Sequence, residues 1–224
     1  MDSKKIVSQQ WVINMTDLAQ KNYHDIAEQL SDYCVTDATR RQLDVNVRAM
    51  RPDDKYAMKD IYPTLSQRTL YMRFFRIIET PTLDQLSRFV DMNFTSRIGC
   101  CVTLPNTHQL VGAGRLLRAK SDSDIAELSC IVVDDYQSKG IGRVLLNHLF
   151  AMGKCAGVKT ILALVHNQNQ AMLRLLKSCG YPVEVMYDDG EFEVTLDLTR
   201  DAPSNQAIDR HVSIAPMHQG VDPV

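Results

Sequence analysis

The chain has 224 residues, of which 45% are hydrophobic and 23% charged, and its formal net charge is −2. This length suits one domain with extensions and a sizeable core, and a charge so close to zero excludes a general electrostatic attraction to nucleic acid or anionic membranes. Because the sequence also lacks a run of about twenty apolar residues and the basic start and apolar centre of a signal peptide, we expect a cytoplasmic protein with neither a nucleic-acid nor a membrane partner.

Residues 1–43 read as an N-terminal helical extension. A polar lead-in is followed by an amphipathic segment in which apolar side chains recur at helical spacing from Ala19 to Tyr33. We expect this helix to pack either on the domain or on a second copy of the chain, so a homodimer is one candidate assembly.

The domain is expected over residues 44–199. Alternating apolar and polar residues between Leu43 and Met50 predict its first strand, and Arg51-Pro52-Asp53-Asp54 then opens a helix. Apolar stripes at helical spacing predict three helical segments, over residues 58–65, 70–78 and 82–90. Residues 98–104 and 110–117 predict an antiparallel pair of strands joined by a short polar loop.

A strand followed by a glycine-containing loop and a helix forms the centre of the sequence. The β-branched run over residues 128–133 predicts a core strand, and apolar spacing from Val144 to Met152 predicts a helix. The first N–H groups of a helix lack internal partners and carry its positive dipole end, so the loop between them is a candidate anion site. Gly140 and Gly142 permit close approach of a diphosphate, and Lys139 and Arg143 add positive charge. An ordinary strand-to-helix turn is the alternative.

The remaining elements follow the same pattern. Residues 160–165 predict a strand, residues 169–178 a helix that ends before Gly180, and residues 183–186 and 191–198 a final hairpin. Residues 200–224 contain three prolines and no apolar periodicity, which predicts a disordered tail whose histidines are solvated.

Six cysteines, at positions 34, 100, 101, 130, 155 and 179, show no C-x-x-C pair and no zinc-finger spacing with histidine. This pattern predicts reduced thiols buried in apolar surroundings, and no metal site.

Three motifs resemble the GNAT superfamily of acyl-CoA N-acyltransferases. Q-x-x-G-x-G at residues 137–142, directly after V-V-D-D-Y, is similar to its motif A, and N-x-x-M-L-x-L-x-x-x-x-G-Y from Asn169 is similar to its next motif. L-S-Q-R-T-L-Y-M-R-F-F at residues 65–75 resembles the L-S-x-x-S-x-x-x-R-F segment of bacterial protein lysine acetyltransferases, with Thr69 in place of the second serine. In that branch these helices cover the acceptor side of the active site.

The resemblance covers roughly residues 45–198 and implies an α/β fold, a mixed and mostly antiparallel splayed sheet flanked by helices. It also implies that acetyl-CoA is the cosubstrate and that no metal takes part. Asn169 matches the asparagine that contacts the pantetheine or diphosphate, with a helix N-cap as the alternative role. Backbone amides of the loop would hold the pyrophosphate, namely those of Gln137, Ser138, Lys139, Gly140, Ile141, Gly142 and Arg143. An oxyanion donor is expected among the N–H groups of Ile131, Val132 and Val133, where the superfamily has a strand bulge.

Glu127 is the candidate general base. The string A-E-L-S-C-I-V-V at residues 126–133 aligns with A-E-F-A-V-V-V of the lysine acetyltransferase branch, which carries a catalytic glutamate. We expect partial burial of Glu127 to raise its pKa toward that of a useful base, and a solvated strand-end charge is the alternative. Many relatives have a tyrosine that protonates the departing thiolate. Leu176 stands at that position, so the proton donor is left open.

The resemblance thus predicts direct transfer of an acetyl group to an amine in a ternary complex, with a protein lysine side chain as the favoured acceptor. A small-molecule amine is the alternative acceptor, because it would share every cofactor residue. A non-catalytic acyl-CoA sensor is the third possibility, and the presence of Glu127 argues against it.

Overall fold

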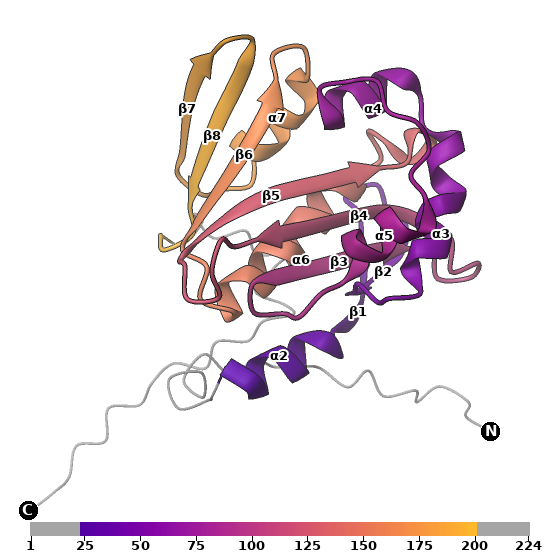
Figure 1. The fold of residues 1–224 in the computed structure, drawn as a ribbon, viewed down its shortest axis with the longest axis horizontal. Coiled ribbons are helices and arrows are strands. Elements are labelled where there is room, and N and C mark those ends of the chain that lie inside the picture. The colour runs from indigo at the N-terminus through magenta and orange to yellow at the C-terminus, as the bar shows by residue number, and fades with distance from the viewer. Residues whose placement is uncertain (1–22, 201–224) are drawn as a thin grey trace, which may run out of the picture.

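One mixed sheet organises the described part of the chain, residues 23–200, in a computed structural model (Figure 1). Its eight strands stand in the order β1-β2-β3-β4-β5-β6-β8-β7, and all neighbouring pairs are antiparallel except β5 and β6. The strands are β1 (Cys34–Ala38), β2 (Asp44–Ala49), β3 (Arg97–Thr103), β4 (Leu110–Leu117), β5 (Ile125–Val132), β6 (Thr160–His166), β7 (Val183–Asp188) and β8 (Glu191–Asp197). The mixed, mostly antiparallel sheet expected from the sequence is confirmed.

Helices cover both faces of this sheet (Figure 1). They are α2 (Tyr23–Ser31), α3 (Asp54–Ile61), α4 (Gln67–Phe74), α5 (Leu83–Val90), α6 (Ile141–Cys155) and α7 (Gln170–Lys177), with short 3₁₀ turns at Tyr62–Thr64 and Asp134–Tyr136. On one face, which we call the α6 face, Leu145 and Leu149 are fully buried in a core that also includes Leu176 of α7. On the other, the α4 face, Met58 and Leu86 form a second core with α4.

The sheet opens between its two parallel strands. β5 and β6 pair over only three positions, Ile125 with Thr160, Ala126 with Ile161 and Glu127 with Leu162. Beyond Glu127, β5 continues along β4 while β6 continues along β8, so the two strands diverge (Figure 1). The predicted splaying of the central strands is therefore confirmed.

Residues 34–38 differ from the prediction of a helical extension, because they form the edge strand β1 and pair with β2 along its length. A short edge strand with polar Thr36 and Asp37 carries little periodic signal, which explains why the sequence pattern did not show it. The turn between α2 and β1 and the strand itself are both fastened to α6, since the Tyr33 hydroxyl lies 2.5 Å from His148 Nδ1 and the Asp37 carboxylate 2.9 Å from His148 Nε2.

Residues 1–22 and 201–224, the latter with nearly all of the predicted tail and its histidines, lie outside the described residues. The division into extension, domain and tail stays a prediction. Every cysteine thiol is free, but Cys34 is exposed rather than buried as expected. Within residues 23–200 no helix has the length and apolar content needed to cross a bilayer, and no group of three His, Cys, Asp or Glu side chains is arranged to hold a metal.

Candidate active site

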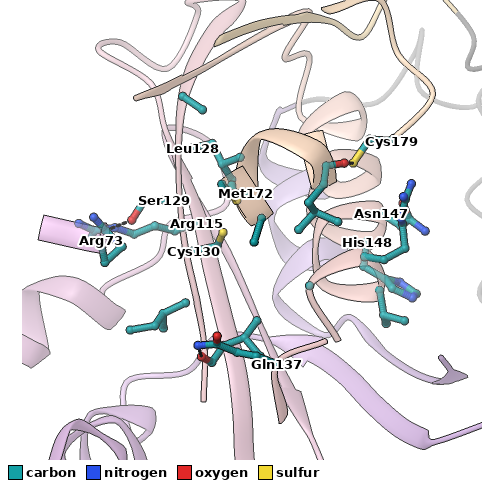
Figure 2. A pocket seen from close by; sticks show the side chains of 18 of the residues that line it. Arg73, Arg115, Leu128, Ser129, Cys130, Gln137, Asn147, His148, Met172 and Cys179 are labelled. Atoms are coloured by element: carbon teal, nitrogen blue, oxygen red, sulfur yellow. Dashed lines mark hydrogen bonds between the residues drawn. The ribbon is translucent and has the colours of Figure 1, made fainter. Parts of the chain in front are cut away.

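The divergence of β5 and β6 opens into a cleft of about 2370 Å³ (Figure 2). It is lined by β5, by the loop before α6, by α4 and by the facing parts of α6 and α7. Typical small-ligand pockets enclose about 300–1,000 Å³. This cleft therefore has room for a long cofactor together with a second substrate.

The loop before α6 presents a row of free backbone N–H groups. Those of the five consecutive residues from Ser138 to Gly142 donate no hydrogen bond to any other residue that the structure describes. Gly140 has φ 95°, in the left-handed region, and a Cβ there would lie 3.0 Å from the Cβ of Thr39. Successive free amides at the start of a helix form a concave anion site. The loop is thus more than an ordinary turn.

Both ends of the expected row are occupied. The Gln137 N–H donates to the Asp134 carbonyl at 3.1 Å, and the Arg143 N–H donates to the Gly140 carbonyl at 3.1 Å, so neither amide is free for a phosphate. The Arg143 guanidinium instead donates to the Ser178 carbonyl and hydroxyl at the end of α7. Lys139 stays exposed, with Nζ 5.0 Å from the centre of the Tyr136 ring.

Asn169 lines the cleft and caps α7. Its side-chain oxygen accepts a hydrogen bond from the Met172 N–H at 3.1 Å, which confirms the alternative role considered for this residue. Among residues 23–200 its amide nitrogen has no hydrogen-bond partner and can still donate to a ligand in the cleft.

The backbone of β5 differs from the expected bulge. β5 pairs with β4 from Glu127 to Val132 without a register shift, and the Val133 N–H donates to the Val111 carbonyl at 3.0 Å. Because N–H directions alternate along an antiparallel strand, the Val132 N–H points away from β4, toward the space that β6 has left. The departure of β6, rather than a bulge, frees this amide, and the Val133 amide is not available.

Helix α4 is fastened beside the cleft by one carboxylate, which sequence reasoning missed. Asp134, directly after β5, accepts hydrogen bonds from the Ser66 N–H at 3.0 Å, the Ser66 hydroxyl at 2.7 Å and the Thr69 hydroxyl at 2.8 Å. Burial alone would raise the pKa of Asp134, but these hydrogen bonds outweigh it and hold the pKa below its ordinary value. Gln137 Nε2 adds contacts to the Thr69 hydroxyl at 3.0 Å and the Val132 carbonyl at 3.1 Å.

The hydroxyls of the L-S-x-x-T string therefore hold α4 against the loop. A pair of hydroxyls three residues apart, with an Asp after the core strand, is the signal that could have found this anchor. At the other end of α4, Tyr71 packs edge-on against His166 of β6, with ring centres 5.2 Å apart. Helix α4 thus spans the opening between β5 and β6.

Glu127 stands where the two strands part. It is the last residue of β5 that pairs on both sides, with Leu117 of β4 and Leu162 of β6. By alternation its side chain shares a face with Ser129, which receives a hydrogen bond from Arg73 of α4, so Glu127 faces the α4 side of the cleft. Its side chain is exposed, so the partial burial expected for it is wrong: at this point β6 turns away and leaves the residue in the open mouth of the cleft.

A family model described as the Acetyltransferase (GNAT) family matches residues 65–181, just over half of the chain. The chain belongs to the GNAT acetyltransferase family. The matched segment of this GNAT protein contains the row of free amides, Asn169 and Glu127.

Three comparisons place this GNAT protein among its relatives. It is 28% identical to the acetyltransferase Pat of Mycolicibacterium smegmatis over 115 residues, which are 51% of this chain but only 34% of that protein. The GNAT domain of S. lividans PAT superposes with a TM-score of 0.69 at 24% identity, over 74% of this chain and 97% of that one. YncA of Salmonella typhimurium, described as a putative acetyltransferase with its cofactor acetyl-CoA, superposes with a TM-score of 0.54 at 21% identity, over 72% and 98% of the two chains. The two structural likenesses concern the fold.

Proposed function

We propose that this protein transfers the acetyl group of acetyl-CoA to a lysine side chain of a protein, with Glu127 as general base. One observation carries the proposal: the divergence of β5 and β6 brings an exposed carboxylate and the free Val132 N–H to a single opening. A base for the ammonium and a donor for the developing oxyanion are the two groups that transfer to an amine requires.

The residues of the loop suit the cosubstrate. The N–H groups from Ser138 to Gly142 would bind the pyrophosphate at the positive end of α6, and the Asn169 amide would donate to the diphosphate or pantetheine. From there the cleft leads between β5 and β6, which directs the thioester toward the α4 face.

Acetyl transfer then follows from these positions. The Glu127 carboxylate accepts a proton from the ammonium, directly or through one water, and the freed amine attacks the thioester carbonyl carbon. The Val132 N–H donates to the carbonyl oxygen as negative charge develops on it. The new C–N bond forms, the C–S bond breaks, and the thiolate leaves. The second proton of the attacking nitrogen passes to the departing thiolate, directly or through water, so the products are the neutral amide and the thiol of coenzyme A. Because an ordinary thiol has a pKa of about 8.5, the thiolate of coenzyme A is a tolerable leaving group even though Leu176 stands in place of the tyrosine of many relatives.

The surface beside the opening supports a protein acceptor. Leu164 of β6 and Met186 of β7 are 63% and 61% exposed, and Glu193 of β8 lies between them in the strand register. An open surface with apolar and acidic side chains suits a protein segment that carries a cationic lysine. The M. smegmatis relative is named an acetyltransferase, which agrees with acetyl transfer.

Incubation with acetyl-labelled acetyl-CoA and an extract of the source cells tests the proposal. Label on lysines of particular proteins is expected. Label only on small amines would replace the protein acceptor by a metabolite, and label that stays on coenzyme A despite measurable binding would indicate a sensor.

The role of Glu127 is tested by substitution. Glu127→Gln should lower turnover by about 10²–10⁴-fold without weakening acetyl-CoA binding. Glu79→Gln is the matched control, because Glu79 is exposed and does not line the cleft. Unchanged turnover in a folded Glu127→Gln protein would eliminate the base.

A further inference from the structure

Two arginines stand beside each other on the α4 face of the cleft. Arg73 lies near the end of α4 and Arg115 lies on β4, and both are half-buried in the cleft wall next to Ser129 (Figure 2). Among residues 23–200, neither guanidinium forms an ion pair with a carboxylate. The catalytic steps above use neither of them.

The hydrogen-bonding capacity of this pair is largely unused. A guanidinium has five N–H donors. Arg73 donates to the Ser129 hydroxyl and lies 4.8 Å above the Phe74 ring, while Arg115 donates to the Phe89 carbonyl at 3.2 Å. The Arg115 Nε is buried without any partner.

Two other arginines that face the interior, Arg48 and Arg118, are held by several partners each. Arg48 forms a two-pronged pair with Asp54, with N–O distances of 2.5 and 2.8 Å, and Arg118 donates to three backbone carbonyls. Unlike Arg48, Arg73 and Arg115 have no carboxylate partner among residues 23–200, and both line the cleft.

The two charges also act on each other. Burial lowers the pKa of Arg73, and burial together with the neighbouring Arg73 charge lowers the pKa of Arg115 to about 10. Arginine side chains keep their positive charge in proteins, so the two guanidinium groups repel one another. Partly buried, unbalanced charges destabilise a fold, and a bound anion would relieve that cost.

The pair lies close to the acetyl-transfer centre. Arg115 is opposite Ser129 in the strand register, and Glu127 is two residues further along β5 on the same face. Two residues of a strand span about 6.6 Å. An anion held by the arginines would thus lie a few bonds from an amine held at Glu127.

We propose that Arg73 and Arg115 form a carboxylate-binding subsite for the amine acceptor. The guanidinium fork matches a carboxylate in two-pronged geometry, which a lone ammonium does not. This inference rests on the proposed function, in which an amine enters from the α4 face. The carboxylate comes either from an acidic residue beside the lysine in a protein or from the α-carboxyl group of a free amino acid.

Matched acceptors test the subsite. One set consists of blocked peptides with a single lysine flanked by Asp or by Asn, and the other consists of free amino acids and their amides. The carboxylate member of a pair should be acetylated with a kcat/KM about 10- to 100-fold higher, the effect of one hydrogen-bonded charge. A preference among peptides identifies the acidic side chain as the source, and a preference among amino acids identifies the α-carboxylate.

Substitution separates the subsite from general damage. Arg115→Gln should abolish the preference while leaving kcat/KM for the neutral acceptors within about threefold, and Arg115→Lys should restore part of it because the charge remains but the fork is lost. Arg88→Gln is the control, since Arg88 is an 80% exposed arginine of α5 that does not line the cleft. Equal kcat/KM for both members of every pair would overturn the proposal.

A binding measurement tests the carboxylate subsite even if no amine is acetylated. The Arg115 Nε–H resonance, assigned by its loss in Arg115→Gln, is followed in protein saturated with coenzyme A while the Asp peptide, the Asn peptide, an amino acid or its amide is added. A shift with the carboxylates alone supports the subsite. Failure of acetyl transfer alongside such a shift would refute the proposed function and not the subsite, whereas no shift would refute the subsite.

Discussion

Replacing Asp134 by alanine should lower the free energy of unfolding by about 2 kcal/mol. The side chain accepts three hydrogen bonds, from the Ser66 N–H and from the Ser66 and Thr69 hydroxyls, over 2.7–3.0 Å. Fully buried bonds to a charge contribute about 1.5–3 kcal/mol each. Ser66 is exposed and Asp134 only half-buried, so water replaces much of what the substitution removes, and the expected loss is well below the sum of three such bonds.

Urea unfolding measures this loss. With a denaturant slope of about 2 kcal/mol/M, the midpoint should fall by about 1 M. Ser66→Ala removes one of the same bonds, that of the Ser66 hydroxyl, together with the cap on the Thr69 N–H, whereas the backbone N–H of residue 66 remains. Because the hydroxyl bond is counted in both single losses, the double variant should lose about 1 kcal/mol less than the two single losses together. The control is Asp135→Ala, at an exposed neighbour without a side-chain hydrogen bond among the described residues. An unchanged midpoint for Asp134→Ala, or strict additivity in the double variant, would refute the anchor.

The remaining predictions concern acid stability, the loop, the cap and the thiols. Hydrogen bonding holds the pKa of Asp134 below its unfolded value of about 3.9, so the carboxylate stabilises the fold above about pH 4 and ceases to do so as the pH falls through the lowered pKa. The difference in free energy of unfolding between the unsubstituted protein and Asp134→Ala should therefore vanish only at the acid end of a pH series. Gly140→Ala should cost about 1–3 kcal/mol in thermal unfolding, and more than Gly157→Ala, whose φ is also positive but whose Cβ would meet open space. Asn169→Asp keeps an oxygen for the cap, so the free energy of unfolding should change by less than about 0.5 kcal/mol, whereas acetyl-CoA binding measured by calorimetry should weaken. Unchanged binding would show that the Asn169 amide does not contact the cosubstrate. Cys34 should be the first thiol of residues 23–200 to react with a maleimide, since burial raises the pKa of Cys130 and Cys179 to about 11; fast labelling of either would contradict the packing.

Hydrophobic periodicity and turn residues predicted those elements whose positions depend on residues close to one another in the sequence. The alternation around Val45 and Val47, the helix start near Thr82 and the helix end before Gly180 are local signals, and each corresponds to an element or a boundary in the structure. The motif at the loop likewise located the row of free amides. These features depend on a few neighbouring residues, which is why they are legible in a sequence.

Features that depend on distant partners were not predictable in the same way. The exposure of Glu127 follows from the path of β6, and the free amide of Val132 follows from the same divergence rather than from any local bulge. Arg143 looked like a phosphate ligand because of its position, yet its guanidinium is bound to Ser178, which is 35 residues away in the sequence. Each outcome was decided by an element that the local pattern does not contain.

Strand β1 has a consequence for how this GNAT protein can be shortened. It pairs with β2 from Cys34 opposite Arg48 to Ala38 opposite Asp44, and it brings Asp37 to His148. In a fragment that starts at residue 44, the outer backbone N–H and C=O groups of β2 would be unpaired at the edge of the sheet, and His148 would lose its contact with the Asp37 carboxylate. Unpaired edges recruit strands from other molecules. A catalytic fragment that begins at β2 would therefore aggregate, whereas one that begins at α2 keeps its edge covered.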